Sequence, residues 1–107
     1  MFKLFSLLCL IVAVHPVAIP NYYGEVVFIG DSITDWWRHD GRSVWDQYYE
    51  HLGAVNIGVA GDITQQTIDR IIGGSIDSFD ARVVVLLIGT NDLARGHPIR
   101  YLAPRWS

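Results

Sequence analysis

The segment VVFIGDSITDWW (residues 26–37) joins an apolar run directly to a small polar triplet. The run at residues 25–29 is rich in β-branched and aromatic side chains, a composition typical of a strand buried on both faces. Gly30, Asp31 and Ser32 follow it at once. A serine in this position is either a turn residue or a nucleophile, and the rest of the chain is needed to choose between the two.

The same alternation of apolar run and polar loop recurs along the chain. Further strands are predicted at residues 54–57 and 82–88, and helices at residues 43–52 and 64–72. Gly53 is predicted to end the first helix and Gly73-Gly74 the second, whose first turn Asp62 or Thr64 would cap. This order of strands and helices predicts right-handed βαβ units and a parallel sheet.

Each predicted strand ends in a glycine-containing polar loop, at residues 30–32, 58–62 and 89–92. The carboxyl ends of parallel strands share one edge of a sheet, where ligands bind. We therefore expect Ser32, Gly61 and Asn91 to converge. A hydroxyl, an unobstructed backbone N–H and an amide donor are the groups that acyl transfer needs. The alternative is that the three residues belong to unrelated turns.

Three sequence blocks at these loops follow one another in order: FIGDSIT (28–34), NIGVAGDITQQ (56–66) and LLIGTNDLARG (86–96). Over about residues 25–97 the chain resembles the SGNH (GDSL-type) hydrolase family, and especially its branch of small acetylhydrolase-like esterases. The resemblance implies a flavodoxin-like three-layer α/β/α sandwich, of which about three strands are present here.

The resemblance also implies a role for each matching residue. Ser32 would be the nucleophile, and the oxyanion would be bound by the N–H groups of Ser32 and Gly61 and by the Asn91 side chain. Asp31 would shape the nucleophile loop, and Asp92 would be structural. The implied reaction is hydrolysis of a carboxylic ester, of an acetyl or other short acyl group, through an acyl-serine and without a metal or cofactor. The alcohol portion of the small-molecule, lipid or carbohydrate ester stays open.

The family's last block, an Asp and a His three residues later, is absent. The chain is therefore interpreted as the N-terminal portion of such an enzyme, truncated and nearly inactive by itself, since losing the histidine costs subtilisin about 10⁶ in turnover. No general base is assigned, although His97 and His39 are weighed for the role. His51 is placed at a helix end, and His15 lies in the leader.

Residues 1–19 are typical of an export signal, with Lys3 before an apolar run that is too short to span a bilayer. Ala18 is the candidate last removed residue, and Pro16 fits the cleavage pattern poorly. The alternative is a buried first strand or helix. The predicted organisation is a signal peptide at 1–19, a hydrolase portion at 20–97 and an irregular tail at 98–107, in a secreted or extracytoplasmic protein. Removal of the leader would take away Cys9, the only cysteine.

Composition excludes other classes of function. The formal charge is −3 and Lys3 is the only lysine, so nothing favours nucleic-acid binding. No phosphate-binding glycine motif is present, and Asp35, Asp40 and Asp46 lack the spacing of a metal site. The oligomeric state is left open.

Two expectations concern surfaces. An aromatic group could line an acyl or sugar pocket or simply pack in the core: Trp36, Trp37, Trp45, Tyr48 and Tyr49. The predicted strand ending at residue 88 would be an exposed apolar edge in so short a chain. Two rivals to the esterase interpretation are a binding module that keeps the oxyanion loops without the chemistry, and a non-functional fragment.

Overall fold

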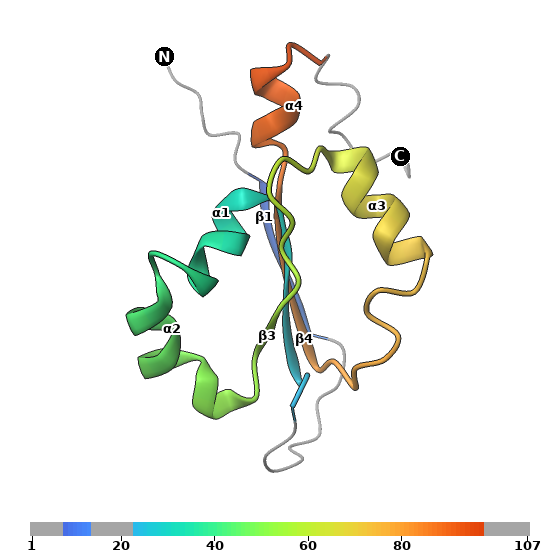
Figure 1. The fold of residues 1–107 in the computed structure, drawn as a ribbon. Coiled ribbons are helices and arrows are strands. Elements are labelled where there is room, and N and C mark those ends of the chain that lie inside the picture. The colour runs from blue at the N-terminus through green and yellow to red at the C-terminus, as the bar shows by residue number, and fades with distance from the viewer. Residues whose placement is uncertain (1–7, 14–22, 98–107) are drawn as a thin grey trace.

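The computed structural model describes residues 8–13 and 23–97, so the predicted tail and most of the predicted export signal lie outside the described residues (Figure 1). Three parallel strands form most of one sheet: β2 (Val26–Gly30), β3 (Val55–Asn56) and β4 (Val83–Ile88). β2 lies between the other two, with Val27 level with Val55 and with Val84. The parallel sheet predicted from the order of strands and helices is confirmed.

Helices cover both faces of this sheet, which Figure 1 shows edge-on. One face carries α1 (Ser32–Asp35), the 3₁₀ turn η2 (Trp36–Arg38), α2 (Arg42–Tyr48) and the 3₁₀ turn η3 (Glu50–Leu52). The opposite face carries α3 (Thr64–Ile72), and α4 (Thr90–Ala94) extends beyond the carboxyl end of β4. The three-layer α/β/α arrangement is therefore confirmed. In the described part of the chain, no helix is both long and apolar enough to cross a membrane.

The outer side of β4 is not exposed, and the expectation of an apolar edge there is wrong. β1 (Leu8–Ala13) pairs antiparallel with it along its whole length, from Leu8 opposite Ile88 to Ala13 opposite Val83. The sheet order is thus β1-β4-β2-β3. β1 satisfies backbone groups that an edge strand leaves unpaired. These residues of the predicted export signal thus take the alternative form considered for the segment, a first strand, while export itself stays a prediction.

The helices match those predicted from the sequence, except at Tyr49. α3 has the predicted bounds, and Gly53, with φ of 68°, ends η3 as expected of a glycine stop. The helix predicted at 43–52 is broken at Tyr49, whose φ is −121°. The Tyr49 ring packs there against Phe28 and Trp45, with ring centroids 5.2 and 5.4 Å away.

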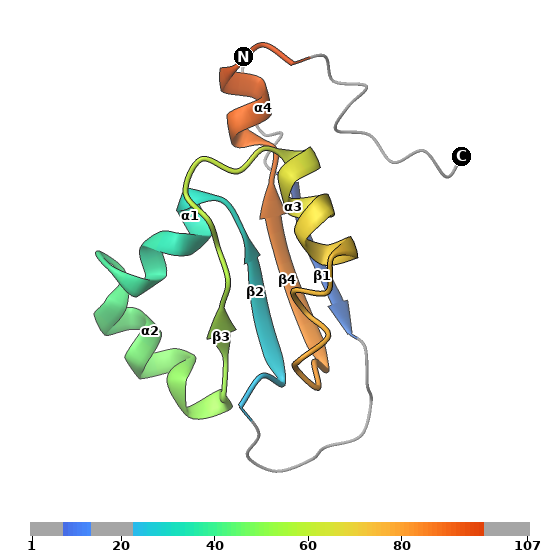
Figure 2. The same cartoon turned by 45° about the vertical axis from the view of Figure 1, so that its right-hand side comes forward.

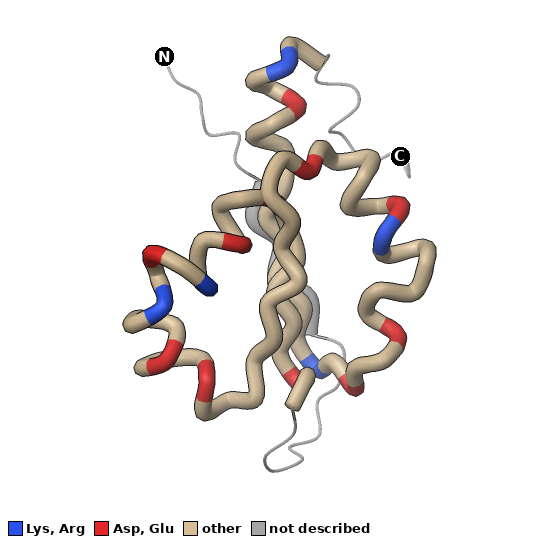
Figure 3. The backbone as a smooth tube through the Cα atoms, in the orientation of Figure 1, with Lys and Arg blue, Asp and Glu red and all other residues tan. Residues whose placement is uncertain are grey.

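The core lies between the sheet and the segment that leads into β4. Val27, Val55 and Ala81 are buried together, and Phe79 and Ile76 pack against them. Figure 3 shows charged residues mainly on the helices and connecting loops. The strands are therefore apolar, and the polar side chains of the candidate site lie on the loops at the strand ends.

Candidate active site

Ser32 lies at the carboxyl end of β2, as the first residue of α1. Asp31 caps this helix, its Oδ1 accepting the backbone N–H of Ile33 at 2.9 Å. Gly30 is required by close approach, since a Cβ there would lie 2.2 Å from the carbonyl oxygen of Leu87 on β4. The loop that carries Ser32 is therefore pressed against the neighbouring strand, which fixes where Ser32 begins its helix.

The second loop follows β3 and is tied to the first. The backbone N–H of Val59 donates to the carbonyl oxygen of Gly30 at 2.9 Å. The Asn56 amide donates to the carbonyl of Thr34 in α1 at 2.6 Å, and Arg38 donates to the carbonyls of Asn56 and Gly58. These hydrogen bonds hold the start of the second loop against the helix that begins with Ser32.

Gly61 is the exposed corner of the second loop. Its φ of +86° lies in the left-handed region, which side chains with a Cβ rarely adopt. Among the described residues outside its immediate chain neighbours, no heavy atom lies within 4 Å of where a Cβ would stand. The backbone at Gly61 is thus open to close approach by a ligand, while its role as an oxyanion donor stays a prediction.

The third loop begins at Gly89 and is bonded to the second. Asn91 Nδ2 donates to the carbonyl oxygen of Asp62 at 2.8 Å, and Arg95 donates to that of Gly61 at 3.1 Å. The three loops thus lie at one end of the sheet, visible in Figure 2 around α1, α4 and the start of α3. The convergence predicted from the sequence is observed for the loops that carry Ser32, Gly61 and Asn91.

Several N–H bonds at this edge have no acceptor among the residues that the structure describes. Neither the Ser32 nor the Gly61 backbone N–H donates to a described carbonyl oxygen. Asn91 Nδ2 uses one described acceptor, and an amide nitrogen carries two hydrogens. The arrangement can therefore present N–H groups to an oxygen that gains negative charge.

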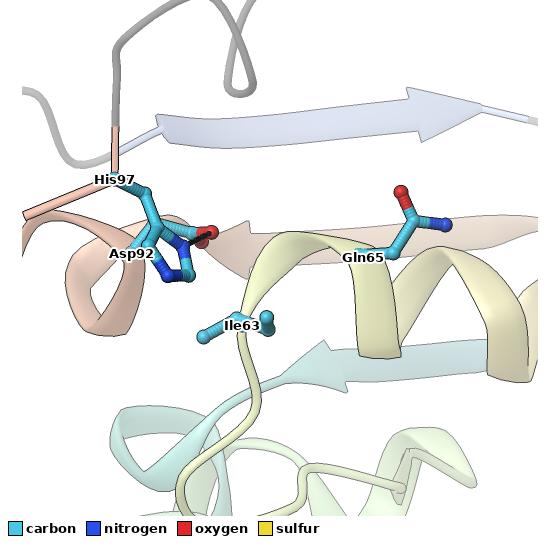
Figure 4. Close-up of a pocket in the computed structure, with 4 residues that line it drawn as sticks. All are labelled: Ile63, Gln65, Asp92 and His97. Atoms are coloured by element: carbon cyan, nitrogen blue, oxygen red, sulfur yellow. Dashed lines mark hydrogen bonds and ion pairs between the residues drawn. The ribbon is translucent and has the colours of Figure 1, made fainter. Parts of the chain in front are cut away.

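Asp92 links the third loop to α3 (Figure 4). Its Oδ2 accepts both the backbone N–H of Thr64 at 2.8 Å and the Thr64 hydroxyl at 2.7 Å, and its Oδ1 lies 3.1 Å from Nδ1 of His97. Asp92 and His97 border a cavity of about 220 Å³ together with Ile63 and Gln65. The predicted cap of α3 by Asp62 or Thr64 is wrong: the N-cap is Ile63, and Asp92 accepts the Thr64 N–H from another loop.

The pKa values of the two acids of the first and third blocks shift in opposite directions. Asp31 is fully buried and its Oδ2 has no described partner; burial raises its pKa, against the hydrogen bond from Ile33. Burial also opposes ionisation of Asp92, but the hydrogen bonds from Thr64 and the contact with His97 outweigh it and hold its pKa below the ordinary value. Asp92 is thus a stable buried carboxylate, in keeping with a structural role.

The described histidines give Ser32 no hydrogen-bonded base. His97 pairs with Asp92, His39 lies at the surface 3.6 Å from Asp35, and His51 is exposed in η3. His15 lies outside the described residues. No hydrogen bond between the Ser32 hydroxyl and another described side chain is present.

The aromatic residues divide between the two roles considered for them. Trp45 is buried and packs with Phe28 and Tyr49, at centroid distances of 5.1 and 5.4 Å. Trp36 and Trp37, by contrast, border a hollow of about 290 Å³ together with Ile33, Asp40 and Gly41. Since Ile33 belongs to α1, this hollow lies beside that helix, while Tyr48 is exposed on α2.

Sequence reasoning missed the residues that join the loops. Arg38 and Asn56 connect α1 to the second loop, and Arg70 reaches the same edge from α3. Arginine on a helix is ordinarily a solvated residue, so nothing in its spacing identified these contacts. The strand-end position of Asn56 was the one available signal.

Comparison with known proteins assigns the family. A family model described as the GDSL-like lipase/acylhydrolase family matches residues 28–105. The chain belongs to this family, which confirms the resemblance that its three blocks carry.

Similar curated proteins lie in its acetylhydrolase-like branch. Platelet-activating factor acetylhydrolase IB subunit alpha1 of Bos taurus is 36% identical over 73 residues, 68% of this chain and 30% of that protein, and the Homo sapiens protein gives the same figures. The alpha2 subunit of Rattus norvegicus is 29% identical over 68 residues, 64% of this chain and 29% of that protein. The chain thus spans about 30% of the length of these relatives. No solved structure matches it.

Proposed function

We propose that this chain carries the nucleophile and oxyanion-binding portion of an SGNH-type carboxylic ester hydrolase. The observation that carries the proposal is the joining of three strand-end loops at one sheet edge, with Ser32 beginning α1 and Asn91 hydrogen-bonded to the loop of Gly61. Membership in the GDSL-like lipase/acylhydrolase family supports it.

In the proposed reaction, Ser32 Oγ attacks the ester carbonyl carbon and the carbonyl oxygen becomes an oxyanion. The backbone N–H groups of Ser32 and Gly61 and one N–H of Asn91 donate to that oxygen. The alcohol leaves with a proton, and water then releases the acyl group as a carboxylic acid and restores Ser32. Such donors are worth most where they are fixed in advance, and the hydrogen bonds between the loops fix them.

The substrate is proposed to be an acetyl or other short acyl ester. The relatives are named as acetylhydrolases of platelet-activating factor, which supports the acetyl group as the acyl portion. The hollow lined by Trp36 and Trp37 offers apolar surface beside α1, the helix that begins with Ser32. We propose it as the place where the apolar part of the substrate lies.

The chain by itself is proposed to be nearly inactive. The Ser32 hydroxyl has no histidine partner among the described residues, and removal of the base costs subtilisin about 10⁶ in turnover. Hydrolysis should then depend on a base supplied from elsewhere, so added imidazole should accelerate the part of the reaction that needs Ser32.

The test is hydrolysis of p-nitrophenyl acetate with and without imidazole, together with labelling by a fluorophosphonate. We expect slow labelling of Ser32 and an imidazole-dependent rate above that of imidazole alone, and this excess should be lost in Ser32→Ala. The exposed Ser43 on α2 provides the matched control, and Ser43→Ala should behave as the wild type. Equal rates and labelling in Ser32→Ala and the wild type would refute an acyl-serine.

A binding module is the second candidate, favoured by the same absence of a described base at Ser32. In that case the loops would bind an ester or carboxylate without cleaving it. Ligand binding that is unchanged in Ser32→Ala, with no imidazole-dependent hydrolysis by the wild type, would favour this function.

Export is proposed as well, on the sequence pattern of residues 1–19. The test is expression of the full chain in a secreting cell, followed by determination of the N-terminal residue of the product. A secreted product that begins after Ala18 or Ile19 is expected. A product retained in the cell with Met1 or Phe2 at its start would refute it.

A further inference from the structure

Arg70 extends from α3 to the edge of the sheet where the three loops meet. Its Nε and Nη2 donate to Oδ2 of Asp62 at 3.0 and 2.7 Å, its Nη1 to the carbonyl oxygen of Ile57 at 2.9 Å, and its Nη2 to that of Gly30 at 3.3 Å. One side chain therefore bonds both β2 and the strand-end segment that follows β3.

These attachment points adjoin the candidate site residues. Gly30 stands two residues before Ser32, and Asp62 directly follows Gly61. Asp62 also accepts, through its backbone carbonyl, the hydrogen bond from Asn91 at 2.8 Å. The guanidinium group thus lies at the centre of a network that reaches all three loops.

We propose that Arg70 is a positioning residue, which fixes the Gly61 N–H relative to Ser32 and so sets the geometry of the oxyanion-binding loops. This inference rests on the proposed function, since it names the residue that aligns the donors of that site. Arg70 acts through Asp62, Ile57 and Gly30, and it is not assigned any contact with the substrate.

The chemistry of the cluster requires a guanidinium group. Asp62 is buried, with 5% of its surface exposed, and its other described side-chain partner is the Thr67 hydroxyl at 2.9 Å. A buried carboxylate needs an opposite charge or several donors. The fork of Arg supplies donors in three directions, whereas the ammonium of Lys is a compact charge on a flexible stem.

A purely electrostatic role would make a different prediction. If Arg70 only neutralised Asp62, Lys would substitute for it. If the fork positions the loops, Arg70→Lys keeps the charge but loses the simultaneous bonds to Ile57 and Gly30. The Gly61 and Ser32 amides should then move although the fold persists.

The experiment records ¹⁵N–¹H spectra of the full chain while sodium acetate is added as a carboxylate probe. In the wild type we expect the Ser32 and Gly61 backbone amides and the Asn91 side-chain amide to shift with acetate. In Arg70→Lys the shift of the Gly61 amide at a fixed acetate concentration should fall at least fivefold. A wild-type response in Arg70→Lys would overturn the proposal.

Two controls separate positioning from stability. Arg42→Gln breaks an exposed ion pair with Asp46 and should leave the acetate response unchanged. Thr67→Val removes the other hydrogen bond to the Asp62 carboxylate while leaving Arg70 in place, so it should lower the unfolding midpoint and retain the response. Loss of the response in Thr67→Val to the same extent as in Arg70→Lys would show that Arg70 has no special role.

If Arg70→Lys does not fold, the double variant Asp62→Asn/Arg70→Gln takes its place, because the double variant leaves no unpaired buried charge. Retention of the acetate response there would overturn the proposal, and its loss in a folded protein would support it.

The proposed function and this inference can fail separately. If the wild type shows no acetate response, the oxyanion site is refuted. The role of Arg70 is then judged by the unliganded spectra: amides of Gly61 and Ser32 that shift in Arg70→Lys, with Val55 unchanged, support positioning. Amides that stay at their wild-type positions overturn it.

Discussion

The same substitution should destabilise two glycines of the site to different extents and for different physical reasons. At Gly30 a Cβ would lie 2.2 Å from the Leu87 carbonyl oxygen and 2.6 Å from Thr34 Oγ1, so Gly30→Ala must push β2 away from β4. Overpacking costs about 1–3 kcal/mol and occasionally more, and the obstacle here is backbone. We expect a loss of about 3 kcal/mol, out of the roughly 5–15 kcal/mol that a domain has.

At Gly61 the obstacle is conformational instead. In the described part of the chain, no heavy atom beyond the immediate chain neighbours lies within 4 Å of the added Cβ, but φ of +86° is unfavourable for alanine. Left-handed backbone costs a residue with a Cβ about 1–2 kcal/mol. We therefore expect Gly61→Ala to fold with a smaller loss of stability than Gly30→Ala.

Urea unfolding followed by tryptophan fluorescence measures both free energies, with circular dichroism as the second probe of a two-state transition. A loss of about 3 kcal/mol lowers the thermal midpoint by roughly 12–24 °C in a domain of this size. Gly30→Ala within about 1 kcal/mol of the wild type, or Gly61→Ala as damaging as Gly30→Ala, would refute this reasoning.

Three further predictions concern charge and packing. Burial raises the pKa of Asp31, so the folded state binds this proton more tightly than the unfolded state, and stability should increase as pH falls from neutral towards 3.8. In urea titrations, Asp31→Asn should be more stable than the wild type at pH 7 and should lose that pH dependence. The pKa of Asp92 is lowered, so the stabilisation by its carboxylate is present above pH 3.8 and is lost as pH falls below that value. Asp92→Ala should cost about 3 kcal/mol at pH 7, because both Thr64 donors lose their acceptor, and an unfolding midpoint equal to that of the wild type would contradict this. Trp45→Ala should cost about 3–5 kcal/mol by leaving a cavity, whereas Trp36→Ala, at a side chain 57% exposed, should change the unfolding free energy by less than about 0.5 kcal/mol. Equal effects of the two substitutions would show that the buried aromatic cluster does not stabilise the fold.

The strands and the site loops could be predicted because their signals are local. The apolar runs at residues 25–29 and 82–88 identify buried strands, and the polar triplets that follow them mark strand ends. Parallel topology then brings Ser32, Gly61 and Asn91 to one edge without any knowledge of contacts. The helix at Thr64–Ile72 followed likewise from its apolar face and its glycine stop.

The remaining features depend on partners that are distant in sequence. The first turn of α3 is capped by Asp92 from the third loop, and no local capping pattern contains that information. Tyr49 interrupts the predicted helix where its ring meets Phe28 of β2. The four donor contacts of Arg70 likewise depend on where α3 lies over the sheet, which residue spacing does not specify.

The pairing of β1 with β4 has a consequence for how the chain is made. Leu8–Ala13 leaves the ribosome first, but its partner strand ends only at Ile88, 75 residues after Ala13. At the usual rate of synthesis this interval lasts roughly 4–15 s. During that time β4 is incomplete, so the segment LCLIVA stays accessible to any factor that binds apolar segments. Under the proposed export, the speed of translation would set how the nascent chain divides between export and folding with β1 in place.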